Sequence, residues 1–245
     1  MSLPSVETPR YELTLPSQDI KVQFRPFLVK EEKVLLTAIE TGTEKDIQIA
    51  TKEVLRACTF ETIDVDKLPT FDIEYLFLQI RSKSVGEVSK FRVICPDDKQ
   101  TYVDVEVDIS KIEVQVDDAH TNNVLLDEQR KLGLVLKYPT LNEIQANVNI
   151  DQLNYDSIFD VIINCIDYIY EGEKSYPAKD STKAELKTFV EGLSQNQFDK
   201  MRKFFETMPR LRHEIEVENP KTKVKSKVTF EGLADFFAYA SPTTA

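Results

Sequence analysis

Residues 71–108, FDIEYLFLQIRSKSVGEVSKFRVICPDDKQTYVDVEVD, decide the fold class because their apolar side chains change spacing partway along. From Phe71 to Ile80 the apolar residues leave little polar surface, which is typical of a helix at the centre of a core. After Glu87, apolar and polar side chains alternate, and Pro96–Lys99 forms a turn between two alternating runs. The stretch therefore predicts a buried helix followed by a pair of antiparallel strands.

Upstream, the sequence predicts a hairpin and two helices. Tyr11–Leu15 and Ile20–Phe24 alternate on either side of the turn Pro16–Asp19, as the strands of a hairpin do. Lys30–Ile39 and Glu44–Ala57 instead repeat their apolar residues at helical spacing. These two segments are therefore expected to be helices.

Downstream, strands are expected first and helices afterwards. Ile112–Val116 alternates and Leu132–Tyr138 is a further strand candidate, so residues 87–138 are predicted to form one meander of antiparallel strands. The chain is predicted to be helical from Leu141 onward, with a largely buried helix over Ile158–Ile169.

Two helix starts in the C-terminal part carry a recognisable signal. Thr182 with Glu185, and Ser194 with Gln197, have the spacing of a capping box. In this motif the first side chain binds the backbone amide three residues on, and the later side chain binds the first residue's amide. Each pair therefore predicts the beginning of a helix.

Two further elements are expected near the end of the chain. His213–Val217 and Val224–Phe230 alternate on either side of Asn219–Thr222 and predict a closing hairpin. Leu233–Phe237 supplies the apolar residues of a predicted terminal helix.

The predicted fold class is α+β: an N-terminal β-hairpin with helices, central antiparallel strands, C-terminal helices and a closing β-hairpin. Three regions are expected, namely residues 1–86, 87–140 and 141–245, unless these form one continuous domain. A chain of 245 residues is long enough to bury a full core.

Charge restricts the kinds of partner. The net charge is −11, from 31 basic and 42 acidic side chains. On average the chain would repel a phosphate backbone, so nucleic acid is excluded as a main partner. Acidity is the ordinary state of a soluble cytoplasmic protein, and the alternative explanation is a basic partner attracted by the acidic field.

Cysteine and apolar residues indicate the compartment. Cys58, Cys95 and Cys165 are far apart and lie in or beside apolar runs, so we expect reduced core thiols. The longest apolar stretch, Ile158–Tyr170, is interrupted by acidic residues and is too short to span a bilayer. The opening MSLPSVETPR has no apolar signal core. We therefore expect a soluble protein with no membrane partner.

The sequence lacks the motifs of common catalytic sites. Its six glycines never take the spacing of a phosphate-binding loop, and it has no G-x-S-x-G elbow. His120 and His213 are its only histidines, too few for a three-histidine zinc site. We read His213 as a half-exposed strand residue. We therefore expect no enzyme activity, no cofactor, no bound metal and no small-molecule substrate.

A row of carboxylates is the most prominent charged feature. Asp104, Glu106 and Asp108 share one face of a predicted strand, because side chains alternate along a strand. Like charges in a row repel, so this face must meet water, a cation or a basic partner. The three residues are therefore candidates for docking a partner.

A second acidic group consists of Asp117, Asp118 and His120 in a turn-like segment. Hard cations bind several carboxylate oxygens, so a metal cluster is one interpretation. The spacing matches no calcium loop, and an acidic surface turn is the other interpretation. A metal-assisted hydrolase that combines this group with the carboxylate row is the alternative to a non-catalytic role.

A row of lysines lies near the predicted closing hairpin. Lys221, Lys223, Lys225 and Lys227 alternate, which places their charges on one strand face. Lysines of this kind commonly protect an exposed sheet edge from aggregation. The alternative is docking against an acidic partner, so these residues are also candidates for partner docking.

Six segments share their sequence pattern with one protein family. They read LPSV at 3–6, YELTLP at 11–16, FRPFLVKEEK at 24–33, FDIEYLFLQIRSKSVGE at 71–87, FFETMP at 204–209 and FEGL at 230–233. The segment at 71–87 is the most specific. Together they resemble the T4-type phage baseplate family, which contains the baseplate hub subunit and the hub assembly protein.

This resemblance implies a structural or assembly role in the central hub of a contractile tail. The implied partners are other phage baseplate hub proteins. The implied location is the virion tail baseplate, or the bacterial host cytoplasm during assembly. The resemblance implies no catalytic residue, and it leaves open whether the protein is a permanent component or a transient assembly factor.

Overall fold

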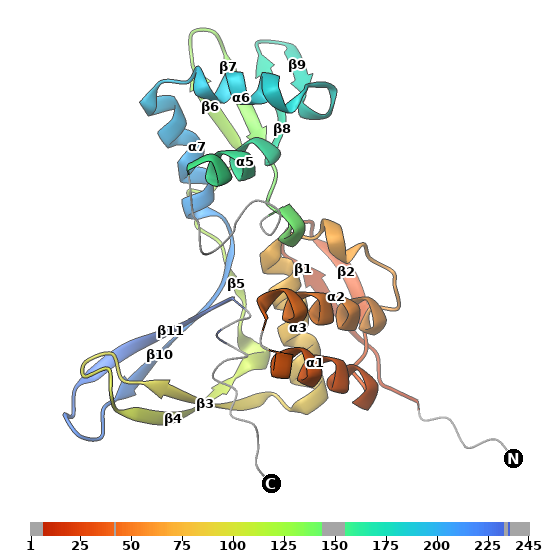
Figure 1. Cartoon of the computed structure of the whole chain (residues 1–245), viewed down its shortest axis with the longest axis vertical. Coiled ribbons are helices and arrows are strands. Elements are labelled where there is room, and N and C mark those ends of the chain that lie inside the picture. Colours follow the sequence, from red (N-terminus) through yellow and green to blue (C-terminus); the bar gives the residue numbers. More distant parts are fainter. Residues whose placement is uncertain (1–6, 42, 144–154, 233–234, 236–245) are drawn as a thin grey trace, which may run out of the picture. The chain divides into compact units, whose positions relative to one another are not determined.

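The chain folds into two compact units, as a computed structural model describes for residues 7–41, 43–143, 155–232 and 235. Unit 1 comprises residues 1–115 and 210–245, and unit 2 comprises residues 116–209. Unit 2 is therefore an insertion in the sequence of unit 1 (Figure 1). The α+β class is confirmed. The unit boundaries fall inside the regions 87–140 and 141–245 that the sequence suggested.

Unit 1 contains the predicted opening hairpin, three helices and closing hairpin. Its elements are β1 (Tyr11–Leu15), β2 (Ile20–Phe24), α1 (Val29–Thr41), α2 (Glu44–Cys58), η1 (Val65–Lys67), α3 (Thr70–Val85), β3 (Val88–Ile94), β4 (Tyr102–Asp108), η2 (Ile109–Lys111), β5 (Val114–Gln115), β10 (Arg210–Glu218) and β11 (Lys225–Glu231). The two hairpins and the helices α1, α2 and α3 lie where local periodicity predicted them.

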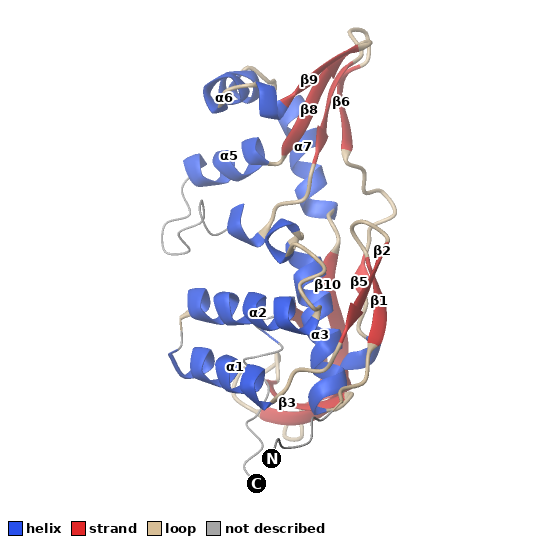
Figure 2. Ribbon diagram, turned by 90° about the vertical axis from the view of Figure 1, so that its right-hand side faces the viewer, coloured by secondary structure: helices blue, strands red, loops and turns tan. Residues whose placement is uncertain are grey.

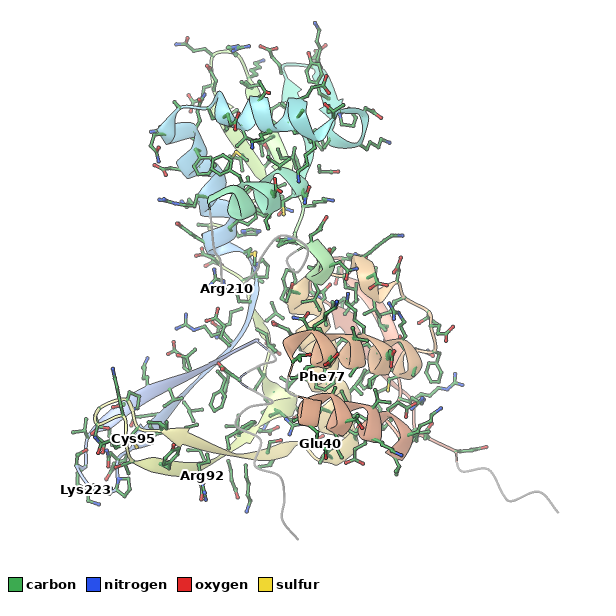
Figure 3. The ribbon with its side chains drawn as sticks, in the orientation of Figure 1. Glu40, Phe77, Arg92, Cys95, Arg210 and Lys223 are labelled. Carbon is green, nitrogen blue, oxygen red and sulfur yellow. The ribbon has the colours of Figure 1, made fainter. Side chains whose placement is uncertain are left out.

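Helix α3 is the central element of unit 1, as its apolar sequence predicted. Phe77, which is labelled in Figure 3, is buried together with Ile73, Leu76 and Ile80. Burying side chains of this size stabilises a fold by about 1.5–3 kcal/mol each. Asp72 is buried as well, and its carboxylate accepts hydrogen bonds from the backbone N–H of Ser17, at 3.2 Å, and from the Ser17 hydroxyl. These bonds hold the turn of the β1–β2 hairpin against the start of α3.

Two hairpins, β3–β4 and β10–β11, form a projection of unit 1 that we call the hairpin arm (Figure 1). Their inner faces share one apolar cluster, in which the rings of Phe91 and Phe230 lie 5.1 Å apart between centroids. Leu78 joins the same cluster from α3. A lone two-stranded hairpin is marginal in water, so each hairpin depends on the apolar face of the other.

The prediction of a single meander over residues 87–138 was wrong. Among the described strands, β3 pairs with β4 alone, and β5 pairs with β10, with Gln115 opposite Arg210 and Val114 opposite Leu211. The remaining strands of this stretch belong to unit 2. Alternation identifies a strand and its buried face, but it does not specify which other strand will supply the hydrogen bonds.

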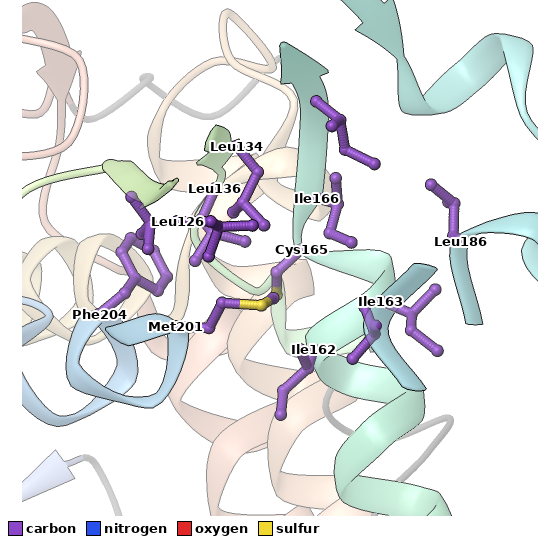
Figure 4. Close-up of a cluster of buried hydrophobic side chains, with 13 residues drawn as sticks. Leu126, Leu134, Leu136, Ile162, Ile163, Cys165, Ile166, Leu186, Met201 and Phe204 are labelled. Carbon is purple, nitrogen blue, oxygen red and sulfur yellow. The ribbon is translucent and has the colours of Figure 1, made fainter. Parts of the chain in front are cut away.

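Unit 2 is an antiparallel four-stranded sheet, in the order β6-β7-β8-β9, with helices packed on one face (Figure 2). Its elements are β6 (Asn123–Asp127), β7 (Leu132–Leu136), α5 (Tyr155–Asn164), β8 (Ile166–Glu171), β9 (Lys174–Pro177), η4 (Ala178–Asp180), α6 (Lys183–Glu191) and α7 (Gln195–Thr207). Figure 4 shows its core, where Leu134 and Leu136 of the sheet meet Met201 and Phe204 of α7. Both predicted capping boxes are present at the starts of α6 and α7.

The predicted helix over Ile158–Ile169 was wrong beyond Asn164, because β8 begins at Ile166. A bulge in the β7–β8 pairing lets Ile166 and Ile169 both face the core although they are three residues apart. A three-residue interval between buried residues is normally a helical signal. The bulge therefore produced a helix-like spacing within a strand.

Two predicted segments lie outside the described residues. Helical structure begins at Leu141, but residues 144–154 are not described. The predicted terminal helix at Leu233–Phe237 is also outside them, apart from Asp235.

Candidate docking surfaces

The carboxylate row on β4 meets cations on the neighbouring strand β3. Arg92 lies directly opposite Asp104 and donates to both of its carboxylate oxygens, from Nε at 2.8 Å and from Nη2 at 3.2 Å. Lys90 lies opposite Glu106, with Nζ 3.3 Å from Oε1. The hydrogen bond from Arg92 lowers the pKa of Asp104. The outer face of this hairpin is therefore a ladder of exposed ion pairs.

Asp108, the third member of the row, is engaged at the end of β4. Its Oδ1 accepts hydrogen bonds from the backbone N–H of Ser110, at 3.2 Å, and from the Ser110 hydroxyl, at 2.6 Å. Its Oδ2 lies 2.7 Å from the ammonium group of Lys111. Together Lys111 and Ser110 lower the pKa of Asp108. Asp108 thus caps the 3-10 turn η2 and fixes the direction in which the chain leaves the strand.

Two of the four predicted docking lysines are paired within the closing hairpin. Lys225 Nζ lies 3.1 Å from Glu216 Oε1, and Lys227 Nζ lies 3.2 Å from Glu214 Oε2. The glutamates alternate along β10 in the sequence HEIEVE. Sequence reasoning missed this acidic row, although its alternation opposite the lysines was a signal that could have revealed it. The hairpin arm therefore carries a second ion-pair ladder on β10 and β11.

Lys221 and Lys223 lie in the turn between β10 and β11, and Lys99 lies in the turn between β3 and β4. Figure 3 places Lys223 and Cys95 at the same end of the hairpin arm. Among the residues that the structure describes, no carboxylate forms an ion pair with any of these three lysines. We call the turns 96–100 and 220–224 together the arm tip.

The carboxylates of the arm tip are committed to internal hydrogen bonds. Asn219 is fully buried, and its side-chain amide donates to Asp97 Oδ1 at 3.0 Å and Oδ2 at 3.1 Å. Thr222 Oγ1 also donates to Asp97, at 2.5 Å, and Asp98 accepts two backbone N–H groups of its own turn. These bonds lower the pKa of both aspartates. Both aspartates therefore stay ionised, and the tip carries three ammonium groups against two carboxylates.

The second acidic group does not form a metal site. His120 Nδ1 lies 3.0 Å from Thr207 Oγ1, and its Nε2 lies 3.0 Å from the hydroxyl of Tyr138, so both ring nitrogens are engaged. Burial lowers the pKa of His120. Asp117 accepts the backbone N–H of Ala119 at 2.8 Å, as in an ordinary Asx turn. Within the described residues, no three His, Cys, Asp or Glu side chains come close enough to hold a metal ion.

The three cysteine side chains are buried. Cys58, Cys95 and Cys165 are free thiols with no exposed surface. Burial raises the pKa of Cys58 to about 11 and that of Cys165 to about 12. A thiol is nucleophilic only as the thiolate, so these residues are not reactive. None of the described helices has the length and apolar character needed to cross a bilayer.

Comparison with protein-family models identifies the family. The model described as T4 bacteriophage base plate protein matches residues 8–238. The chain belongs to this family. The match includes all of unit 2 and the described part of unit 1 from residue 8, so both units are part of a base plate protein fold. No curated protein and no solved structure matched the chain.

Family membership bears directly on the two predicted functions. A base plate protein is a structural part of a phage tail, in agreement with the resemblance seen in the six sequence segments. The hydrolase alternative gains no support, because Asp104 and Glu106 are paired with cations in unit 1 and both nitrogens of His120 are bound within unit 2.

Proposed function

We propose that this chain is a non-catalytic structural or assembly protein of the central hub of a phage contractile-tail baseplate. It acts through contacts with other hub proteins, and the arm tip docks on an acidic surface of one of them. The observation that carries the proposal is the arm tip, whose three lysines form no ion pair with the described carboxylates, at the end of an arm whose strands carry ladders of ion pairs, in a chain with a net charge of −11.

The charge pattern of the hairpin arm favours docking through its tip. Along both hairpins, exposed acidic and basic side chains alternate across the strands, as Arg92 with Asp104 and Lys225 with Glu216 show. Charged side chains along an edge oppose the addition of another strand. Lysines that lack a carboxylate partner at the tip would instead attract an acidic surface and orient it during encounter.

The hydrogen bonds at the arm tip support a preformed docking surface. Asn219 and Thr222 of one turn bind Asp97 of the other, so the two turns are held together before any partner arrives. A surface that is already ordered loses less conformational entropy on binding. The lysines carried by these turns are therefore presented at nearly fixed backbone positions.

Charge reversal at the arm tip tests the proposal. Full-length protein is co-expressed with each of the other hub and wedge proteins of the same phage, and co-purification is measured at several salt concentrations. The variant K99E/K221E/K223E should lose the partner that wild type retains, whereas K131E/K174E/K179E, which reverses three exposed unit 2 lysines, should not. The proposal is wrong if wild type binds no hub protein, or if both triple variants bind equally well.

The same experiment extends to the intact particle. A permanent hub component would be found in purified virions by mass spectrometry, and a transient assembly factor would be found only in the host cytoplasm. Either outcome is consistent with the proposed binding to hub proteins. The formation of normal tails when the gene is deleted would contradict the proposed hub function.

A further inference from the structure

Helix α1 exposes an unusual amount of apolar surface for an element that belongs to a compact unit. It packs mainly on α2, and among its residues 29–40 the buried ones are Glu31, Leu35 and Ala38. Val34 of α1 is 38% exposed and Ile49 of α2 is 47% exposed. Single exposed apolar residues are normal, but apolar residues that two neighbouring helices expose on one surface indicate an interaction surface.

The apolar residues on one flank of α1 line a groove between α1 and α2. The groove has a volume of about 430 Å³, and the apolar residues that line it are Val34, Ala38, Ile49 and Ala50. The two helices lie side by side and are joined by a very short connection, so they run antiparallel (Figure 2). The groove therefore extends along both helices for about two turns, or roughly 10 Å.

The two rims of the groove carry opposite charges. Lys30 and Lys33 line it from α1, and Asp46 and Glu53 line it from α2. The two lysines are about one helical turn apart and the two acidic residues about two turns apart. Each rim therefore carries charge of one sign along the groove. An occupant would therefore meet a basic side and an acidic side with apolar residues between them.

We propose that this groove binds one amphipathic α-helix of another baseplate protein. A helix lying between two antiparallel helices places its apolar stripe on the apolar residues that line their groove, as in a three-helix bundle. Acidic residues of the bound helix face Lys30 and Lys33, and its basic residues face Asp46 and Glu53. The inference rests on the proposed function only in that the partner is taken from the baseplate.

A second copy of this chain is a poorer occupant of the groove. It would present the same concave surface, and two facing grooves leave the space between them unfilled, which loses dispersion contacts. Each copy also carries a net charge of −11, so their association is opposed by repulsion. A convex, separate helix avoids both costs.

Site-specific cross-linking tests the inference in the full-length protein. A photoreactive benzoylphenylalanine replaces Thr37, which lines the groove, and the protein is co-expressed with each of the other baseplate proteins of the same phage. After irradiation, mass spectrometry maps the adduct. We expect an adduct within a helical segment of one baseplate protein. The added substitutions V34D and I49D should lower its yield at least about tenfold, because they remove aliphatic contacts worth that much in affinity.

A matched control lies on the same helix. Leu36 is more exposed than Val34 but does not line the groove, so L36D should leave the adduct yield unchanged. Exchanging the rim charges with K33E and D46K keeps the net charge and should weaken cross-linking several-fold. Thermal unfolding of V34D/I49D should match that of the parent, because both side chains are already more than a third exposed.

Four outcomes would overturn the inference. These are no adduct with any baseplate protein, an adduct with a second copy of the chain, an adduct with residues 233–245 of the same chain, and an equal loss of yield from L36D. Co-purification through the arm tip is measured separately with K99E/K221E/K223E. If that binding is normal and Thr37 gives no adduct, the groove inference fails while the proposed hub function stands.

Discussion

The side-chain amide nitrogen of Asn219 donates to both carboxylate oxygens of Asp97, which lies 122 residues earlier in the chain. The two residues belong to the turns of different hairpins. The Asn219 side-chain oxygen in turn accepts the backbone N–H groups of Lys221, at 2.9 Å, and Thr222, at 3.3 Å. A single buried side chain thus orders one turn and attaches it to the other.

Replacement of Asn219 by alanine should loosen the hairpin arm. The variant loses two hydrogen bonds to a carboxylate and leaves backbone donors of its own turn without their acceptor, so we expect a loss of roughly 2 kcal/mol in the free energy of unfolding. Denaturant titration measures this loss, and hydrogen exchange should accelerate in residues 88–108 and 210–231. N196A, at an exposed position of α7, is the control and should change little. Unchanged exchange in the arm would refute the role assigned to Asn219.

Removal of Glu31 should be among the most damaging single changes in unit 1. Arg25 Nη2 lies 2.9 Å from Glu31 Oε1, both residues are buried, and the backbone N–H of Leu28 donates to Glu31 Oε2 at 2.8 Å. E31A leaves the guanidinium buried without its counter-ion, a change that typically costs about 3–5 kcal/mol. The double variant R25M/E31L should recover much of this loss in denaturant titrations. E12A breaks the exposed pair with Lys21 and should have a much smaller effect.

The stability contributed by Asp72 should decrease as pH rises. Burial raises the pKa of this carboxyl, and the hydrogen bonds from Ser17 offset the effect only in part. The folded-state pKa lies above the unfolded value of about 3.9, so the unfolded state releases its proton first as the pH rises. Between the unfolded and the folded pKa, the contribution of Asp72 to the free energy of unfolding therefore decreases. D72N stays neutral and can still accept the Ser17 amide. Its free energy of unfolding relative to wild type should therefore rise as the pH increases above the unfolded pKa of about 3.9.

Two comparisons decide this prediction. D72A leaves the Ser17 donors without an acceptor and should be less stable than wild type across the same pH range. A difference between D72N and wild type that does not vary with pH would show that Asp72 has an ordinary pKa in the folded protein.

The three cysteines should not react with Ellman's reagent in the folded protein at mildly alkaline pH. Cys58, Cys95 and Cys165 are buried, and burial raises the pKa of each thiol. All three should react after unfolding in guanidinium, which the absorbance of the released thiolate measures. Rapid reaction of one thiol in the native state would indicate local opening around it.

Local sequence patterns were sufficient for most individual elements. The hairpin of Tyr11–Leu15 with Ile20–Phe24, the central helix from Thr70 and the two capping boxes lie where their spacing predicted them. Each of these patterns depends on residues within about four positions of one another, which is the range over which backbone hydrogen bonds and side-chain direction act in a helix or hairpin.

The partners of the candidate docking residues required the tertiary structure. Alternation placed Asp104, Glu106 and Asp108 on one face, but it did not show that Arg92 and Lys90 would stand opposite two of them. Strand register decides such cross-strand pairs. The same applies to Lys225 and Lys227, which were interpreted as edge protection or as docking residues and are paired with glutamates.

The sequence by itself determined the α+β class, the chain's acidity and the family to which it belongs, because these depend on composition and on short-range patterns. Only the tertiary structure decided that β5 pairs with β10, that Asn219 binds Asp97, and that α1 and α2 leave a charged-rim groove between them. Each of these features joins segments whose meeting depends on how the whole chain packs, and no local spacing encodes that choice.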